Sequence, residues 1–191
     1  IEGRKGNHEV VRDEQPHRAV KEKIPNLMPV FAKDGTVTAA NTSSISDGAS
    51  AMVLADLKYA EENNINPAAY LVGHARHSLK PNDFTLAPIG AVKKLCGKVG
   101  WDIKDVDLFE INEAFAMVTI LAMKELNIDH SKVNVYGGAC AQGHPFGSTG
   151  SRIIVTLVYA LHRLGKSRGI AALCIGGGEA TAVAVEISCS V

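Results

Sequence analysis

Three short motifs in the second half of the chain carry side chains suited to proton transfer. Asn112 opens the motif NEAFA, His144 lies in GHPFG, and Cys174 opens CIGGG. An imidazole titrates near neutral pH and is the most common general base, and a thiol beside glycine amides suits proton transfer next to an oxyanion. The amide of Asn112 could hold a water molecule or a substrate carbonyl. Together the motifs predict acid–base chemistry at a carbonyl compound.

Each of these three residues also has a structural interpretation, which the motifs alone leave open. Asn112 could cap a helix, His144 could be a hydrogen-bonded histidine in a tight loop, and Cys174 could pack as a small hydrophobic residue. Pro145 restricts the backbone of His144 to extended conformations, and a helix is expected to begin near Ser148. The positive end of that helix should disfavour a protonated imidazole and keep a neutral base available.

Other cysteines, histidines and glycine-rich stretches are weaker candidates for a site. The cysteines lack CxxC spacing, and Cys140 with His144 provides too few ligands for structural zinc, so no metal is expected. GGGEAT does not match the dinucleotide-binding pattern GxGxxG, and GHPFGSTG lacks the lysine of a phosphate-binding loop. We expect structural roles for the remaining residues of these types: Cys96, Cys140, Cys189, His74, His77, His130 and His162.

Apolar runs and helical patterns predict the elements that position these motifs. Buried strands are expected at 49–55, 68–78, 106–112, 132–136, 169–175 and 181–187. Helices are expected at 56–63, capped by Asp56, at 85–99, with Thr85 as cap and Pro88 in the first turn, at 113–126 and at 148–164. The last two strands flank three glycines as a hairpin. This order predicts a layered α/β domain with a mixed sheet.

Two segments suggest that the chain needs support from elsewhere. The helix expected at 113–126 is apolar on nearly every side, which predicts burial all round and therefore another domain or chain packed against it. Residues 1–44 are rich in charge and proline, and no regular period persists there. This segment is expected to be an arm or loop.

The overall composition restricts the possible partners. The 191 residues carry 20 basic and 20 acidic side chains, with a pI near 7.2, which gives no support for a nucleic-acid or anionic-membrane partner. No apolar run reaches the roughly 18 residues of a membrane span. The scattered cysteines and the absence of a visible signal peptide favour a reducing, cytoplasmic location.

The motifs NEAFA, GGACAQGHPFGSTG and CIGGG, in this order, resemble those of the thiolases, which make or cleave 3-oxoacyl-CoA. The resemblance extends upstream through GRKG, DEQP and KDGTVTAANTSSISDGASAMVL and so covers essentially the entire chain. GWDIKDVDLFEINEAFA is especially similar to the acetyl-CoA acetyltransferase branch of the family. Thiolases are about twice this length, and their nucleophilic cysteine lies in the first half, which this sequence lacks.

The resemblance implies a fold of two βαβαβαββ halves stacked in five layers, of which this chain looks like the second. Three regions follow: a remnant of the coenzyme A-binding loop domain (1–44), final elements of the N-terminal domain (45–66) and the C-terminal domain (67–191). The helix at 113–126 would belong to the shared central layer. A homodimer or homotetramer, completed by the missing N-terminal half, is expected.

By similarity, His144 activates the missing nucleophile and, with a water held by Asn112, helps to form an oxyanion hole. Cys174 exchanges a proton with Cα of the second acetyl-CoA, and the N–H of Gly176 is a donor of a second oxyanion hole. The remaining implied substrate contacts are Ala39 and Ser43 along the pantetheine of coenzyme A, and Phe115 beside the thioester. Coenzyme A thioesters are substrates here, so no cofactor is expected.

The implied activity is condensation of two acetyl-CoA to acetoacetyl-CoA and CoA, and its reverse, in lipid metabolism. A degradative 3-ketoacyl-CoA thiolase of fatty-acid oxidation remains an alternative, because FTLAP at 84–88 replaces the usual Met-Gly-x-Gly-Pro and Phe84 could shape the acyl pocket. Ala40 and the pair Glu179-Ala180 also depart from the family pattern. A third possibility is a non-catalytic folded fragment, since proton-transfer groups without an acyl acceptor should not turn over.

Overall fold

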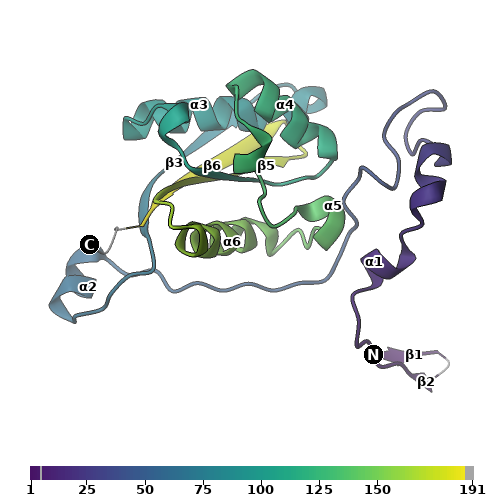
Figure 1. Ribbon diagram of the computed structural model, residues 1–191, viewed down its shortest axis with the longest axis horizontal. Helices are drawn as coiled ribbons and strands as arrows, with labels where there is room; N and C mark the ends of the chain where they lie inside the picture. The colour runs from purple at the N-terminus through teal and green to yellow at the C-terminus, as the bar shows by residue number, and fades with distance from the viewer. Residues whose placement is uncertain (5, 188–191) are drawn as a thin grey trace.

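A four-stranded mixed sheet organises the computed structural model, which describes residues 1–4 and 6–187 (Figure 1). Its strands lie in the order β3-β6-β5-β4. Strands β4 and β5 are parallel, whereas β6 is antiparallel to both β3 and β5. The strands are β3 (Tyr70–Ser78), β4 (Leu108–Ile111), β5 (Arg168–Ile175) and β6 (Glu179–Glu186).

Helices cover both faces of this sheet. Helices α3 (Ala87–Val99) and α4 (Ala116–Leu126) lie on one face, and α6 (Thr149–Leu164) lies on the other (Figure 1). Neighbouring strand residues alternate between the two cores: Phe109 packs on the α3 and α4 side, and Leu108 packs on the α6 side. Because both faces are covered, all four residues of β4 are buried, including the charged residue Glu110.

The periodicity of α6 explains its position. Ile153, Leu157, Ala160 and Leu161 are fully buried and follow the spacing of one helix face. The helix ends at Gly165, whose φ of 61° is the left-handed conformation of a helix C-cap. Helix α3 ends in the same way at Gly100, with φ 71°.

The rest of the described chain forms short elements around this core. The N-terminal arm lies to one side of the sheet, and an extended segment then runs along α6 (Figure 1). Ser50 anchors that segment, because its hydroxyl donates to the carbonyl of Ser148, 3.0 Å away. The short elements are β1 (Glu2–Gly3), β2 (Gly6–Asn7), α1 (Glu14–Arg18), α2 (Leu57–Glu62) and α5 (Ala139–Gln142), with 3₁₀ turns η1 (Lys21–Asn26), η2 (Pro81–Leu86), η3 (Ile103–Asp105) and η4 (His130–Lys132).

Most of the expected elements are confirmed. Four of the predicted strands correspond to β3, β4, β5 and β6, and the last two form the expected hairpin. Asp56 caps α2 by accepting from the backbone N–H groups of Lys58 and Tyr59, and Pro88 lies in the first turn of α3. Thr85 does not cap α3, since it lies within η2 and Leu86 occupies the cap position.

Two predicted strands are wrong. Residues 49–55 are extended but pair with no strand among the described residues, and Val53 and Leu54 are 97% and 70% exposed. The stretch 132–136 forms only an isolated bridge from Val133 to Phe109. Its ladder stops at Asn134, whose φ of 48° lies outside the β region.

Helix α4 is shorter and less buried than its composition predicts. It begins at Ala116, after Phe115 in the cap position. Val118 and Ala122 face the core, but Met117 and Ile120 are 40% and 50% exposed. Within the described chain α4 is therefore buried on one side only, and its burial on all sides by another domain or chain stays a prediction.

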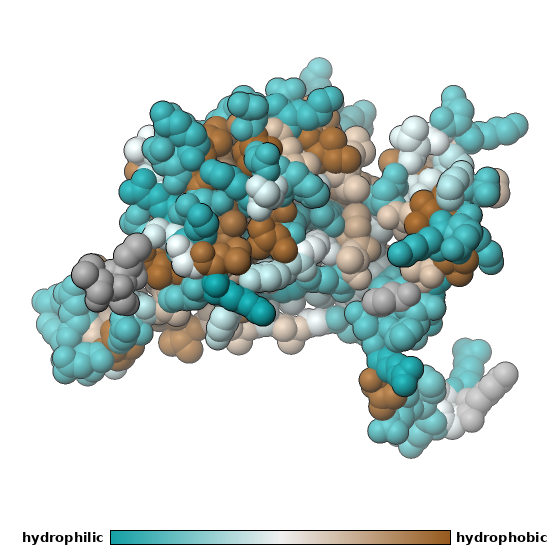
Figure 2. All heavy atoms as spheres, viewed as in Figure 1, coloured by the Kyte–Doolittle hydropathy of each residue, from teal (hydrophilic) through white to brown (hydrophobic). Residues whose placement is uncertain are grey.

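Large apolar side chains are exposed on several other elements. Figure 2 shows apolar patches on both the body and the N-terminal arm. Val53 and Ile45 on the extended segment, Tyr159 on α6 and Met28 on the arm are each more than 70% exposed. No helix in residues 1–4 and 6–187 is long and apolar enough to cross a membrane. Cys189 lies outside the described residues.

Candidate active site

Asn112 lies directly beyond the carboxyl end of β4 and extends its ladder. Its backbone N–H donates to the carbonyl of Ala172 in β5, 2.9 Å away. The side chain is 99% buried, and its Oδ1 has no hydrogen-bond partner among the described residues. Ligands of open α/β sheets bind at the carboxyl ends of strands. Asn112 is not the cap of α4, because Phe115 holds that position and α4 starts later.

His144 lies in a loop between α5 and α6 that glycine makes possible. Gly143 ends α5 with φ 88°, and an added Cβ there would lie 2.2 Å from the hydroxyl of Ser46. The backbone N–H of His144 then donates to the carbonyl of Ser44, at 2.9 Å. The imidazole packs against Phe146, with ring centroids 4.5 Å apart. The segment around Ser44 thus holds the loop from outside the sheet.

Asn112 and Thr149 determine which nitrogen of His144 carries the proton. Its Oγ1 lies 2.7 Å from Nδ1 of His144 and donates its single proton to the carbonyl of Pro145, 3.0 Å away. The amide nitrogen of Asn112 can only donate, so its contact with Nε2 is satisfied when Nε2 carries no proton, and Nδ1–H then donates to the Thr149 hydroxyl. Nε2 is left without a proton in the neutral ring, and it faces Asn112, whose Nδ2 donates to it at 3.4 Å. The structure thus brings Asn112 and His144 together with the lone pair of Nε2 directed toward the Asn112 amide.

The environment favours the neutral form of His144. Burial lowers the pKa of the imidazole below its usual 6.5, and the positive charge of Arg152 lowers it further. The direction agrees with the prediction from sequence, and burial and Arg152 are two causes that the sequence did not reveal. A neutral imidazole is the form that accepts a proton.

Buried charges lie around Arg152, behind the His144 loop. Glu110 of β4 is 98% buried, and burial raises the pKa of its carboxyl to about 7, against the opposing effect of Arg152. Arg152 donates from Nη1 to Oε1 of Gln142, at 3.3 Å. The guanidinium interacts favourably with the carboxylates of Glu110 and Glu113, and its positive charge lowers the pKa of His144.

Cys174 and Gly176 lie at the same edge of the sheet as Asn112. Since Ile111 pairs with Ala172 in the parallel ladder, Cys174 extends two residues beyond the end of β4, about 7 Å along the strand. Cys174 is 92% buried, and burial raises the pKa of its thiol. Within the described residues no hydrogen bond links this side chain to Asn112 or His144. Gly176 follows in the β5–β6 turn, with open space where a Cβ would lie.

The segment that contains Ser43 lies between the start of α4 and the His144 loop. Ser43 donates from its backbone N–H and from Oγ to the carbonyl of Ala114, at 3.3 and 3.1 Å. Thr42 forms an antiparallel bridge to Phe115. Ala39 is exposed at a turn in the same segment. Ser43 is therefore held at the site by the chain, while Ala39 lies at its open margin.

Phe115 sits between two aromatic rings from distant parts of the chain. Its ring makes edge contacts with Phe31 of the arm, at 5.8 Å between centroids, and with Phe84 of η2, at 6.2 Å. These edge-to-face contacts are favourable and restrict the ring. The three rings form an apolar group next to the Ser43 segment.

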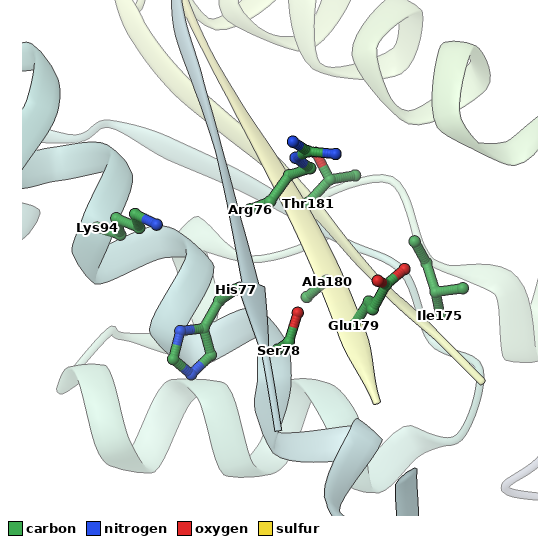
Figure 3. A pocket seen from close by; sticks show the side chains of 8 residues that line it. All are labelled: Arg76, His77, Ser78, Lys94, Ile175, Glu179, Ala180 and Thr181. Carbon is green, nitrogen blue, oxygen red and sulfur yellow. The ribbon is translucent and has the colours of Figure 1, made fainter. Parts of the chain in front are cut away.

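Two open hollows lie away from these residues, along the edge strand β3. One has a volume of about 340 Å³ and is lined at one end by Ile175 and Glu179, which flank the triple-glycine turn (Figure 3). Arg76 and Thr181 lie side by side on one face of the strands there (Figure 3). No group of three or more potential metal ligands occurs in residues 1–4 and 6–187.

The motifs did not identify every residue of this arrangement. Thr149 and Ser44, which hold the ring and the backbone of His144, were not predicted as site residues. Thr149 follows His144 by five residues at a helix start and is fully buried, so a buried hydroxyl within GHPFGSTG was the available signal. The contact to Ser44 joins segments 100 residues apart and has no local signal.

Comparisons with known proteins agree with this arrangement. Residues 1–58 match the family described as "Thiolase, N-terminal domain", and residues 65–187 match "Thiolase, C-terminal domain". The cytosolic acetyl-CoA acetyltransferase of Mus musculus is 47% identical over 189 residues, which cover 97% of this chain and 48% of that protein. The acetyl-CoA acetyltransferase of Saccharomyces cerevisiae is 46% identical over 184 residues, with 95% and 46% covered. The chain spans about half the length of these curated relatives.

Solved structures give the same result. A thiolase from Ascaris suum in complex with coenzyme A superposes with a TM-score of 0.87 at 47% identity, covering 93% of this chain and 46% of that one. Human mitochondrial 3-ketoacyl-CoA thiolase superposes with a TM-score of 0.82 at 37% identity, covering 90% and 43%.

Proposed function

This chain belongs to the thiolase family and has the thiolase fold, and we propose that the protein it represents is an acetyl-CoA C-acetyltransferase. The proposed reaction condenses two acetyl-CoA to acetoacetyl-CoA and CoA, and the reverse reaction is thiolysis. The observation that carries the proposal is the Asn112–His144 pair, in which Nδ1 of a half-buried imidazole contacts Thr149 and Nε2, facing Asn112, is the proton acceptor.

In the first half-reaction, His144 acts on a cysteine that a longer parent protein supplies. Nε2 takes the thiol proton, and the thiolate attacks the carbonyl carbon of acetyl-CoA. The C–S bond of the thioester breaks, and the departing coenzyme A thiolate takes up the thiol proton of Cys174, which leaves Cys174 as a thiolate. His144 keeps its proton until the enzyme thiolate is released in the second half-reaction. The two donors proposed for the oxyanion are Nε2–H of His144, once the ring has taken up the thiol proton, and a water molecule held by the neighbouring Asn112 amide.

In the second half-reaction, Cys174 exchanges a proton with Cα of the second acetyl-CoA. The resulting carbanion attacks the acetyl-enzyme, a C–C bond forms, and the enzyme thiolate leaves. Gly176 lies in the β5–β6 turn, where an added Cβ would meet nothing within 4 Å, and its N–H is the proposed donor to the second thioester oxygen. Burial keeps Cys174 as a thiol at neutral pH, and this form protonates the carbanion in the cleavage direction. These steps need no metal or organic cofactor, because side chains carry both protons.

The segment 39–45 provides the proposed coenzyme A contacts. Ser43 is fixed beside the loop of His144. Ala39 is exposed at the margin of the site, where its small side chain leaves room for the pantetheine of coenzyme A. Phe115 forms the apolar wall beside the thioester and is itself held by Phe31 and Phe84. A wall restricted by two further rings leaves less freedom for a long acyl chain, which supports a short-chain substrate.

The nearest alternative is a degradative 3-ketoacyl-CoA thiolase. It is supported by the 37% identity to the human mitochondrial enzyme and by FTLAP at 84–88. The higher identity to acetyl-CoA acetyltransferases, 46–47%, favours the short-chain proposal. Comparison of kcat/KM for acetoacetyl-CoA and a long-chain 3-ketoacyl-CoA separates the two. Equal or faster thiolysis of the long chain contradicts the short-chain assignment.

The organisation of the whole protein follows from the same proposal. Residues 1–44 belong to the loop domain that holds coenzyme A, 45–66 to the N-terminal domain and 67–191 to the C-terminal domain. The exposed apolar residues Val53, Tyr159 and Ile45 then contact the N-terminal half. We also propose a homodimer or homotetramer that acts in lipid metabolism. The cytosolic mouse relative supports a cytoplasmic location.

The decisive experiment measures thiolysis of acetoacetyl-CoA by the full-length parent and by two variants. His144→Ala and Cys174→Ala should each lower kcat by at least about 100-fold, because each removes a proton-transfer group. A near-normal rate in either variant contradicts the role assigned to the residue replaced. An inactive parent contradicts the proposed function. The 191-residue chain alone should be inactive for lack of the nucleophile, and measurable turnover by it would refute that expectation.

A further inference from the structure

The side chain of Asn134 pairs with the backbone at the outer edge of β4. It does so directly after the isolated bridge between Val133 and Phe109. Its Oδ1 accepts from the backbone N–H of Ile111 at 2.8 Å, and its Nδ2 donates to the carbonyl of Ile111 at 2.9 Å. One amide side chain thus satisfies both backbone groups of the residue before Asn112. The same Nδ2 also donates to Oε1 of Glu113, 3.2 Å away. Asn134 therefore connects the end of β4 to the Glu113 carboxylate.

The other oxygen of Glu113 holds the helical turn that leads to His144. Oε2 accepts from the backbone N–H of Cys140, 3.1 Å away, in the first turn of α5. The cap residue of α5 is Gly138, which has no side chain to accept this bond. Glu113 thus takes the place of a capping side chain from a distant part of the sequence. Helix α5 ends at Gly143, directly before His144.

The close approach of the carboxylate explains why position 138 is glycine. A Cβ built on Gly138 would lie 2.3 to 2.5 Å from the carboxyl atoms of Glu113, which is closer than non-bonded atoms approach. Both carboxylate oxygens are engaged by chain donors, one by Asn134 and one by Cys140. The side chain is therefore a link between two segments.

We propose that Glu113, held by Asn134, is a positioning residue that sets the separation of Asn112 and His144. Glu113 follows Asn112 in the chain, and its carboxylate accepts a hydrogen bond from Cys140 in the helical turn before His144. The 3.4 Å separation between the Asn112 amide and Nε2 depends on these two attachments. This inference rests on the proposed function, because that separation matters for the reaction only if the pair forms an oxyanion site.

The kinetic test compares variants of the full-length parent in acetoacetyl-CoA thiolysis. Glu113→Ala should lower kcat about 10- to 100-fold with KM changed by less than about threefold, because misplacement affects the transition state more than substrate binding. Glu113→Gln keeps one acceptor and should lie between Glu113→Ala and the wild type. Gly138→Ala should reproduce the loss by displacing the carboxylate. Glu125→Ala, at an exposed glutamate of α4, is the matched control and should behave as wild type.

A kcat of Glu113→Ala within about twofold of wild type, or an effect on KM alone, overturns the inference. If Glu113→Ala does not fold, Glu113→Gln and Gly138→Ala give the same readout. An inactive wild type contradicts the proposed function instead. The inference is then tested on the 191-residue chain by NMR, where Glu113→Gln should shift the ring ¹⁵N resonances of His144 and the side-chain amide of Asn112. Unchanged resonances overturn it.

Discussion

Thr149 Oγ1 lies 2.7 Å from Nδ1 of His144 and donates to the carbonyl of Pro145. This contact and the Asn112 amide together favour one tautomer, because Nδ2 of Asn112 can only donate to Nε2, and Nδ1–H then donates to the Thr149 hydroxyl. The histidine is therefore a base at Nε2 before any substrate binds. Thr149 is fully buried at the start of α6, where packing keeps it in place.

Replacing Thr149 by valine should reduce activity by releasing the imidazole. Valine is nearly isosteric but cannot accept from Nδ1–H, so the buried ring loses its partner and its preferred tautomer. We expect kcat for thiolysis by the full-length parent to fall about 10- to 100-fold. Thr149→Ser keeps the hydroxyl and should retain kcat within about threefold. Similar rates for the valine and serine variants would show that the hydroxyl does not orient His144.

The acid limb of the pH–rate profile should report His144. Burial and Arg152 both lower the pKa of this imidazole, so the neutral base persists below pH 6.5 and the midpoint of kcat/KM should lie below that value. Arg152→Gln removes the positive charge and should raise the midpoint toward 6.5. Arg152→Lys keeps the charge and is the control. A midpoint that does not move in Arg152→Gln would exclude an electrostatic effect of this residue.

Glu110 should make stability depend on pH. Burial raises the pKa of its carboxyl from 4.5 to about 7, so the folded state favours the protonated form. Between about pH 4.5 and about pH 7 the unfolded state releases this proton while the folded state keeps it. The free energy of unfolding therefore falls with rising pH, by on the order of 3 kcal/mol in total. Glu110→Gln stays neutral and lacks this loss. Urea unfolding of the 191-residue chain and its variant at pH 5 and pH 8 measures the difference. A wild-type-minus-variant difference that is the same at both pH values would contradict the prediction.

Two neighbouring glycines offer a matched test of the β5–β6 turn. Gly178 has φ 95°, and an added Cβ would lie 2.4 Å from the carbonyl oxygen of Leu79. Gly178→Ala should therefore destabilise the chain by at least about 2 kcal/mol. A Cβ on Gly177 would meet nothing within 4 Å, so Gly177→Ala should be nearly neutral. Thermal unfolding of both variants checks this, and equal melting temperatures would show that the turn tolerates side chains at either position.

The sequence predicted those elements whose determinants are local. Helix α6 is specified by its apolar period and its glycine C-cap, and β5 and β6 by apolar runs that flank three glycines. The strand expected at 132–136 failed because Asn134 leaves the β region, with φ 48°. The strand expected at 49–55 failed because strand formation needs a neighbour. Residues 49–55 have the pattern of a buried strand, but no strand of the described chain lies beside them.

By itself the sequence determined the α/β class, the mixed sheet, the family and the three motifs around Asn112, His144 and Cys174, because periodicity, glycines and reactive side chains are local properties of the chain. Only the tertiary structure decided which tautomer of His144 is favoured and that Glu113 grips the turn before it. It also decided that α4 exposes Met117 and Ile120. The physical reason is that hydrogen bonds and burial depend on which distant segments meet, and no local pattern encodes a distance between them.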